Sequence, residues 1–128
     1  MADGLEGVRI VSLDEERLPA VLQTILAECD LGVRIDAAWL RHYTLDDPTC
    51  LPELLLVAEV GSAIAGVLLG CLRGTCGVAK LFGVARRFRR RGIATALFAA
   101  LEERLATLGA HEVVAGGVSP NYVLPGVE

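Results

Sequence analysis

Apolar positions along the chain follow two spacings, which divide it into extended and helical segments. Residues 54–60, 63–73 and 76–85 are three apolar runs, separated by the two-residue turns Gly61-Ser62 and Gly74-Thr75. Apolar runs on such short turns are typical of antiparallel strands joined as hairpins. We therefore expect a three-stranded antiparallel meander in the middle of the chain.

A long amphipathic helix is predicted after this meander, over residues 92–108. Leucines recur there at every third or fourth position, and Glu102 and Glu103 fall on the opposite side. Gly109 comes next and suits the left-handed residue that ends many helices. The apolar side of the helix consists of Leu97, Phe98, Leu101, Leu105 and Leu108.

The first part of the chain predicts a strand followed by a helix. Residues 8–13 alternate enough to form the strand. Ser12 and Glu15 have the spacing of a capping box, which predicts a helix over about residues 14–29. Pro19 lies inside that span, so the alternative is a helix that begins only at the residue before it.

One further helix and one further strand complete the pattern. Asp36 can cap a short helix over residues 37–43, and Asp46-Asp47-Pro48 forms a turn behind it. Residues 112–118 are rich in valine and predict a last strand. The predicted order is strand, helix, helix, three strands, helix, strand.

Composition favours one cytoplasmic domain. A chain of 128 residues can bury roughly two-thirds of its unfolded surface, and 53% hydrophobic with 22% charged residues excludes a disordered chain. No apolar run approaches the ~18 residues of a membrane span, and the acidic N-terminus is unlike a signal peptide. The cysteines have no C-x-x-C spacing, so we expect reduced thiols rather than metal ligands or disulfides. They are Cys29, Cys50, Cys71 and Cys76.

A cationic turn joins the third apolar run to the long helix. Five arginines surround Phe88 within residues 86–91, and Gly92 opens the helix. Backbone N–H groups, the helix dipole and guanidinium groups would converge there, which predicts a phosphate site. The same residues could form a solvated basic loop, or a nucleic-acid contact with Phe88 as the stacking ring. The net charge of −4 gives no broad basic surface, so we expect no nucleic-acid partner.

The stretch Arg89-Arg90-Arg91-Gly92-Ile93-Ala94 resembles the Q/R-x-x-G-x-G/A signature of GNAT-type N-acetyltransferases. In that family this turn binds the pyrophosphate of acetyl-CoA. The flanks agree, with a strand that ends at Val84, an aromatic residue at Phe88 and a helix behind the glycine. The resemblance covers nearly the whole chain. It implies an α+β (α/β) fold with a mixed, mostly antiparallel central sheet flanked by helices.

The resemblance also implies a fold that stops after its fifth strand. Family members continue with another helix and two strands, whereas this sequence ends within the loop of residues 119–128. We therefore expect residues 1–128 to form a single incomplete GNAT-like domain: an N-terminal fragment, a truncated product, or a domain completed by a partner chain. An open sheet edge favours a homodimer or another association that covers it.

The implied activity is acetyl-CoA-dependent acetyl transfer to a small-molecule or protein amine, which attacks the thioester directly. The alternative is a non-catalytic acyl-CoA-binding fragment or module. In the family the pantetheine arm runs between the fourth and fifth strands. Arg90 stands where glycine is common, which implies backbone strain or a contact with the 3′-phosphate. The implied cofactor-binding residues are Phe82 and Val84 on the strand, Arg89, Arg90, Arg91, Gly92, Ile93, Ala94 and Thr95 around the pyrophosphate, and Asn121 after the last strand.

No catalytic residue is predicted. Many family members have a glutamate on the fourth strand, but residues 76–85 hold no carboxylate and only Lys80 as a charged group. Each remaining candidate for acid–base work also has an ordinary structural explanation. These candidates are Glu59, His42, Tyr43, His111 and Tyr122.

Overall fold

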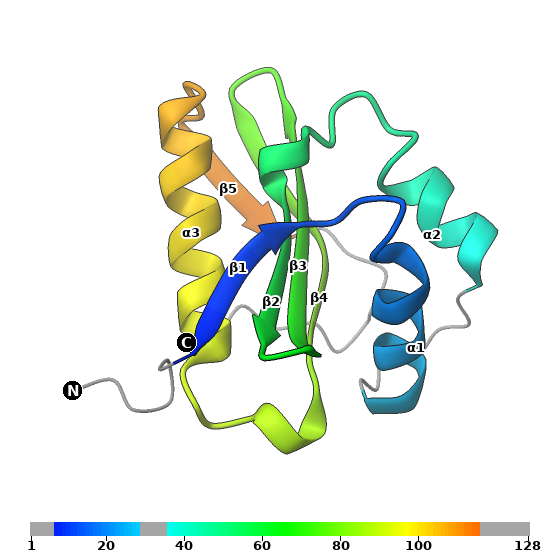
Figure 1. Cartoon of the computed structure of the whole chain (residues 1–128). Coiled ribbons are helices and arrows are strands. Elements are labelled where there is room, and N and C mark those ends of the chain that lie inside the picture. Colours follow the sequence, from blue (N-terminus) through cyan, green and yellow to red (C-terminus); the bar gives the residue numbers. More distant parts are fainter. Residues whose placement is uncertain (1–6, 29–35, 116–128) are drawn as a thin grey trace.

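The structure is a computed structural model, and it describes residues 7–28 and 36–115. A sheet lies between two layers of helices in this part of the chain (Figure 1). Its strand order is β1-β2-β3-β4-β5. The first four strands pair antiparallel and β5 pairs parallel to β4, which confirms the predicted mixed sheet. The strands are β1 (Val8–Ser12), β2 (Leu55–Val60), β3 (Ala63–Arg73), β4 (Cys76–Val84) and β5 (Glu112–Ala115).

Helices cover the two faces of the sheet unequally. Helices α1 (Leu18–Glu28) and α2 (Ala37–Tyr43) lie on one face, and α3 (Ile93–Thr107) lies on the other (Figure 1). Short 3₁₀ turns, Pro52–Leu54 and Arg86–Phe88, precede β2 and follow β4. Each face therefore has a hydrophobic core of its own.

The two hairpin turns contain glycines in the left-handed conformation. Gly61 and Gly74 have φ values of +61° and +66°, which lie in the left-handed region that residues with a Cβ rarely adopt. They close the β2–β3 and β3–β4 hairpins. The predicted meander is confirmed.

The start of α1 differs from the capping-box prediction. Ser12 is the last residue of β1, so it cannot cap the helix. Asp14 closes the following turn by accepting the Arg17 N–H at 2.8 Å. Helix α1 begins at Leu18, just before Pro19, which confirms the alternative start. By contrast, the predicted cap of α2 is confirmed, because Asp36 Oδ1 accepts the Trp39 N–H at 2.8 Å.

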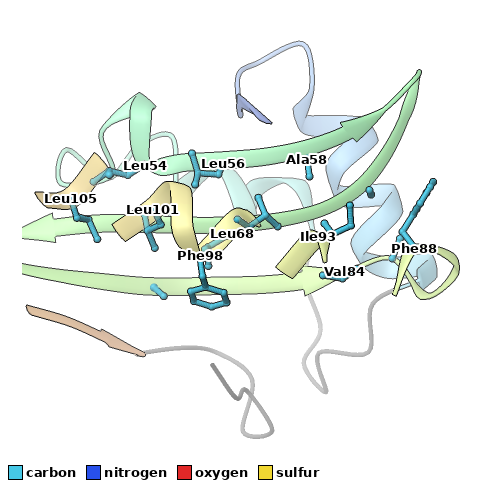
Figure 2. Close-up of a cluster of buried hydrophobic side chains, with 14 residues drawn as sticks. Leu54, Leu56, Ala58, Leu68, Val84, Phe88, Ile93, Phe98, Leu101 and Leu105 are labelled. Carbon is cyan, nitrogen blue, oxygen red and sulfur yellow. The ribbon is translucent and has the colours of Figure 1, made fainter. Parts of the chain in front are cut away.

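Helix α3 packs against β3 and β4 over glycines. The predicted apolar face is buried except for Leu108, which is partly exposed, and it meets the sheet in the cluster of Figure 2. A Cβ placed on Gly70 would lie 3.0 Å from Leu101 Cδ1 and 3.2 Å from the Val78 carbonyl oxygen. A Cβ on Gly66 would lie 3.0 Å from the Gly83 carbonyl oxygen. These glycines allow the close approach of helix and strands.

Several sequence predictions fall on residues that the structure does not describe. These are the end of the last strand (residues 116–118), the loop of residues 119–128 with Asn121 and Tyr122, and Cys29. Within residues 7–28 and 36–115, every helix is too short or too polar to cross a bilayer.

Replacing Gly70 with Ala should lower the free energy of unfolding by roughly 1–3 kcal/mol, because the new methyl group overpacks against Leu101 and the β4 backbone. Urea denaturation measures the change. Leu101→Val removes the δ carbon that the methyl group meets, so the double variant should lose less than the sum of the two single losses. Additive losses would show that the two groups do not collide.

Candidate functional site

The cationic turn is fixed to the core by its aromatic residue. After β4 ends at Val84, the Ala85 N–H donates to the Ala65 carbonyl at 2.7 Å, and the 3₁₀ turn Arg86–Phe88 follows. Phe88 is 8% exposed and belongs to the core beneath α3, beside Val84 and Ile93 (Figure 2). The turn is thus anchored at its centre.

Two arginines lie over the Phe88 ring. The guanidinium carbons of Arg87 and Arg91 are 5.0 and 5.5 Å from the ring centroid, within the range of a cation–π contact. Because this ring is buried and already covered, it is not available to stack on a nucleic-acid base. Phe88 therefore cannot serve as the stacking ring that the nucleic-acid interpretation of the turn requires.

The backbone before α3 turns through two left-handed residues. Arg90 has φ +66° and Gly92 has φ +80°. Arg90 is the non-glycine residue with positive φ in the described part of the chain, and a side chain in this conformation is strained by roughly 1–2 kcal/mol. The glycine that is common in the family at this position would avoid the strain. The expected strain at Arg90 is therefore present.

This turn leaves backbone donors pointing out of the helix start. The first helical hydrogen bond of α3 is donated by the Ala96 N–H to the Gly92 carbonyl oxygen at 3.0 Å. In the described part of the chain, no acceptor is bonded to the N–H groups of residues 91–95. Unpaired N–H groups and the positive end of the helix dipole make such a start a binding site for anions. Arg90, Arg91, Gly92 and Thr95 are all exposed around it.

The residues predicted for the site have two kinds of role in this geometry. Ile93 is buried in the core, so only its backbone faces the helix start. Ala94 is partly buried and Thr95 is exposed, and both are small enough to let a bulky ligand approach the backbone. Arg89 folds back on the strand, where its Nε donates to the Val84 carbonyl oxygen at 3.2 Å.

Val84 directs its backbone away from β3. The neighbouring bond between Ala85 and Ala65 marks the hydrogen-bonded pair, and Val84 is aligned with Gly66 in the next, non-bonded position. Its N–H and carbonyl therefore face the β5 side of β4. Phe82 lies two residues earlier on the strand, so its backbone groups have the same orientation as those of Val84. The centroid of its ring lies 5.1 Å from that of the Phe98 ring.

A bulge interrupts the pairing of β4 with β3. Leu69 is aligned with Leu81 and Gly70 with Ala79, so Lys80 is an extra residue in β4. On its other side β4 pairs with β5 from Cys76 to Ala79, which is as far as the structure describes β5. A bulge bends its strand and increases local twist, so it changes the direction of β4 at Lys80.

The side chains that the sequence offered for acid–base catalysis lie away from the cationic turn and the end of β4, or are already engaged in ion pairs. Glu59 accepts from Arg9 at 2.8 Å and from Arg17 at 2.9 Å, so it is already engaged by β1 and by the turn before α1. His42 is exposed on α2. His111 is exposed after α3, and its backbone N–H donates to the Thr75 carbonyl at 2.7 Å.

A buried charged cluster, which the sequence analysis did not predict, lies on the other face of the sheet. Lys80 is 4% exposed, and its Nζ donates to Asp47 Oδ2 at 2.8 Å and to the Tyr43 carbonyl oxygen at 2.5 Å. The bond from Lys80, together with bonds from Thr49, keeps the pKa of Asp47 well below its usual range. Burial alone lowers the pKa of Lys80, but Asp47 and the neighbouring groups outweigh it and raise that pKa.

The cysteines that the structure describes are free thiols. Cys50 and Cys71 are buried, and Cys76 is partly exposed. Burial raises the pKa of the Cys50 thiol to about 12, so it is protonated and unreactive at neutral pH. Among residues 7–28 and 36–115, no His, Cys, Asp and Glu side chains gather in a group that could hold a metal ion.

Comparison with known proteins agrees with this geometry. Residues 20–123 match the acetyltransferase (GNAT) family model. The chain is 39% identical over 94 residues to an acetyltransferase of Photorhabdus laumondii, which covers 71% of this chain and 62% of that protein. It is 48% identical over 58 residues to an acetyltransferase of Yersinia enterocolitica; this match covers 45% of this chain and 41% of that protein. The chain thus spans less than two-thirds of the length of these relatives.

Solved structures share the fold at low identity. A GCN5-related N-acetyltransferase from Sphaerobacter thermophilus superposes with a TM-score of 0.76 at 22% identity, over 94% of this chain and 39% of that chain. A ribosomal-protein-alanine N-acetyltransferase from Brucella melitensis superposes with a TM-score of 0.71 at 18% identity, over 89% of this chain and 82% of that chain. With the family match over most of the sequence, the chain belongs to the GNAT acetyltransferase family. Its fold is the GNAT acyl-CoA N-acyltransferase fold.

Replacing Arg90 with Gly should raise the free energy of unfolding by about 1 kcal/mol, because the relief of left-handed strain exceeds the entropy that a new glycine adds to the unfolded chain. Urea denaturation measures it. Arg91→Gly is the matched control, since Arg91 does not have a positive φ and gains nothing from glycine. Equal effects of both substitutions would contradict the strain at Arg90.

Proposed function

We propose that this chain binds acetyl-CoA at the start of α3 and transfers the acetyl group to an amine. The observation that carries the proposal is the helix start itself. Left-handed Arg90 and Gly92 expose the N–H groups of residues 91–95 at the positive end of the α3 dipole. Diphosphate oxygens are the acceptors that such a row of donors suits best.

Each residue of the turn then has a role in holding the nucleotide. The backbone of Gly92, Ile93, Ala94 and Thr95 would bind the pyrophosphate. The exposed guanidinium nitrogens of Arg89 remain available for a charge-assisted bond to it while Nε stays on Val84. The exposed Arg90 and Arg91 would add contacts to phosphate oxygens, the 3′-phosphate included. Asn121 is the remaining predicted contact.

The outward backbone of β4 near Val84 supports a site for the pantetheine arm. The backbone of Val84 faces the β5 side of the strand, and the alternation places Phe82 in the same orientation. An extended arm with amide donors and acceptors could bind beside β4 through outward backbone groups such as those of Val84. The thioester would then lie nearer the bulge than the pyrophosphate does, on the same strand.

Catalysis in this arrangement comes mainly from orientation. Holding the thioester beside a bound amine can contribute about 7–11 kcal/mol to lowering the barrier. β4 has no carboxylate, and Glu59 is engaged by two arginines. We therefore infer that the amine loses its proton to water rather than to a side chain of the described residues.

The acceptor, the partners and the location of the protein are further parts of the proposal. The structural neighbours are named for different acceptors: a ribosomal protein's alanine for one and aminoglycosides for another. At such identities these names define no acceptor for this chain. We infer a small-molecule or protein amine, a homodimer or other association at the open sheet edge, and a cytoplasmic location consistent with free thiols. A non-catalytic acyl-CoA-binding module is the second candidate, which the named acetyltransferase relatives do not favour.

Replacing Gly92 with Glu should abolish CoA binding, measured by isothermal titration calorimetry. The new side chain is strained at φ +80° and brings a carboxylate to the phosphate position. Gly109→Glu is the matched control: Gly109 has φ +94° and lies at the other end of α3. That variant should bind CoA like the unaltered chain. Equal loss in both variants, or no loss in either, would overturn the site.

Acetyl transfer should be seen as release of the CoA thiol when acetyl-CoA is mixed with an amine. A panel of spermidine, an alanine-initiated peptide and an aminoglycoside tests it, with a thiol reagent as readout. We expect amine-dependent release with at least one of them and none with Gly92→Glu. Tight CoA binding without release by any amine would favour the non-catalytic module instead.

A further inference from the structure

Arg91 is an exposed arginine that no carboxylate of the described residues neutralises. Elsewhere in the chain four arginines each form an ion pair with an aspartate or a glutamate: Arg9, Arg17, Arg41 and Arg73. Arg91 lies directly before the start of α3 instead, beside the N–H groups that open this helix. Its charge is therefore free to meet an anion that the described part of the protein does not supply.

The side chain of Arg91 is nevertheless held by an aromatic ring. Its guanidinium carbon lies 5.5 Å from the centroid of the Phe88 ring, within the range of a cation–π contact. A planar guanidinium that stacks on a ring keeps its N–H donors in its own plane, where phosphate oxygens can accept two of them. The ring thus restricts Arg91 without using its hydrogen-bond donors.

A second guanidinium lies over the same ring. The Arg87 carbon is 5.0 Å from the Phe88 centroid, so two positive groups share one aromatic side chain. Two like charges held near one another repel, whereas each is attracted to an anion placed close to both. The arrangement over Phe88 therefore favours a negatively charged ligand at this turn.

Phe88 also places what stacks on it near the helix start. It lies at the same end of the core beneath α3 as Val84 and Ile93 (Figure 2). Ile93 is the first residue of α3, so the ring is close to the N–H groups that open the helix. Apart from Phe98, the other buried members of this core are aliphatic, and an aliphatic side chain could fill the site of Phe88 without holding an arginine.

We propose that Phe88 is a positioning residue, whose ring holds the Arg91 guanidinium where it binds the phosphates of the nucleotide. The inference rests on the proposed function and deepens it, because it concerns the same phosphate site at the start of α3. An arginine that is ordered before the ligand arrives loses less conformational entropy on binding, so the ring raises affinity without touching the ligand. Phe88 thereby has a task beyond packing the core.

A double-mutant cycle on CoA binding tests this role, with isothermal titration calorimetry as the measurement. In the unaltered chain, Arg91→Met should raise the dissociation constant about tenfold, because a charge-assisted bond to phosphate is lost. Phe88→Leu should raise it about fivefold, although Arg91 is still present. In the Phe88→Leu background, Arg91→Met should add no more than about twofold, since its guanidinium is no longer held in place.

The salt dependence of binding separates positioning from general loosening of the turn. Added NaCl weakens contacts between exposed charges and phosphate. The dissociation constant should therefore rise less with NaCl in Phe88→Leu than in the unaltered chain, as it should in Arg91→Met. A merely structural role of Phe88 would leave this salt dependence unchanged.

Phe98→Leu is the matched control for the loss of a ring from this core. Phe98 is 9% exposed in the same cluster, and no cation lies over its ring within residues 7–28 and 36–115. In this background Arg91→Met should keep its full effect on CoA binding. Urea denaturation checks that each variant is folded, and Phe88→Met takes the place of Phe88→Leu if that variant is not.

Two results would overturn the positioning role. One is an equal effect of Arg91→Met in the unaltered chain and in Phe88→Leu; the other is unchanged CoA affinity in Arg91→Met. Neither affects the proposed site at Gly92, which has its own test. Absence of CoA binding by the unaltered chain would instead overturn the proposed function, and this inference with it.

Discussion

The close packing of α3 on the glycines of β3 and β4 determines the geometry of the whole site. Gly66, Gly70 and Gly77 leave no Cβ where Ile93, Leu101 and Leu105 come down on the sheet. The helix axis is therefore held near the strands along most of its length. Since the turn from Val84 to Gly92 is short and Phe88 is buried within the same core, the first N–H groups of α3 lie directly beyond the end of β4. A phosphate bound there, as proposed, would therefore lie just beyond the end of β4.

The other face of the sheet is built differently. Helices α1 and α2 pack on an apolar cluster, and one lysine and one aspartate are inserted among these residues. The pair bridges a strand bulge and a loop, two irregular features that hydrophobic packing alone would hold loosely. The two faces of the sheet are thus held by different interactions: α3 by close apolar packing, and the segment after α2 also by a directional polar pair.

The sequence was sufficient for features that depend on neighbouring residues. Leucine spacing predicted α3, glycine turns predicted the β2–β3–β4 meander, and Asp36 predicted the start of α2. For the start of α1 the sequence left two alternatives, a capping box at Ser12 or a helix that begins just before Pro19. The second is confirmed, and only the length of β1, which includes Ser12, decides between them. The Lys80–Asp47 pair could not be predicted, since its partners are 33 positions apart and Asp47 reads as an ordinary turn residue. The bulge that turns Lys80 toward α2 likewise depends on the register with β3.

The charge distribution is consistent with a ligand that is recognised locally. The chain as a whole is acidic, at −4, yet five arginines lie within residues 86–91. A long-range field from the net charge would repel a polyanion, and it is screened beyond about 8–10 Å at physiological ionic strength. Inside that distance the guanidinium groups and the α3 dipole dominate. A compact, multiply charged ligand would therefore be attracted at this one turn, whereas a net charge of −4 gives a nucleic acid no broad basic surface. This difference follows from charge placement alone and favours a small phosphate ligand over a polymer.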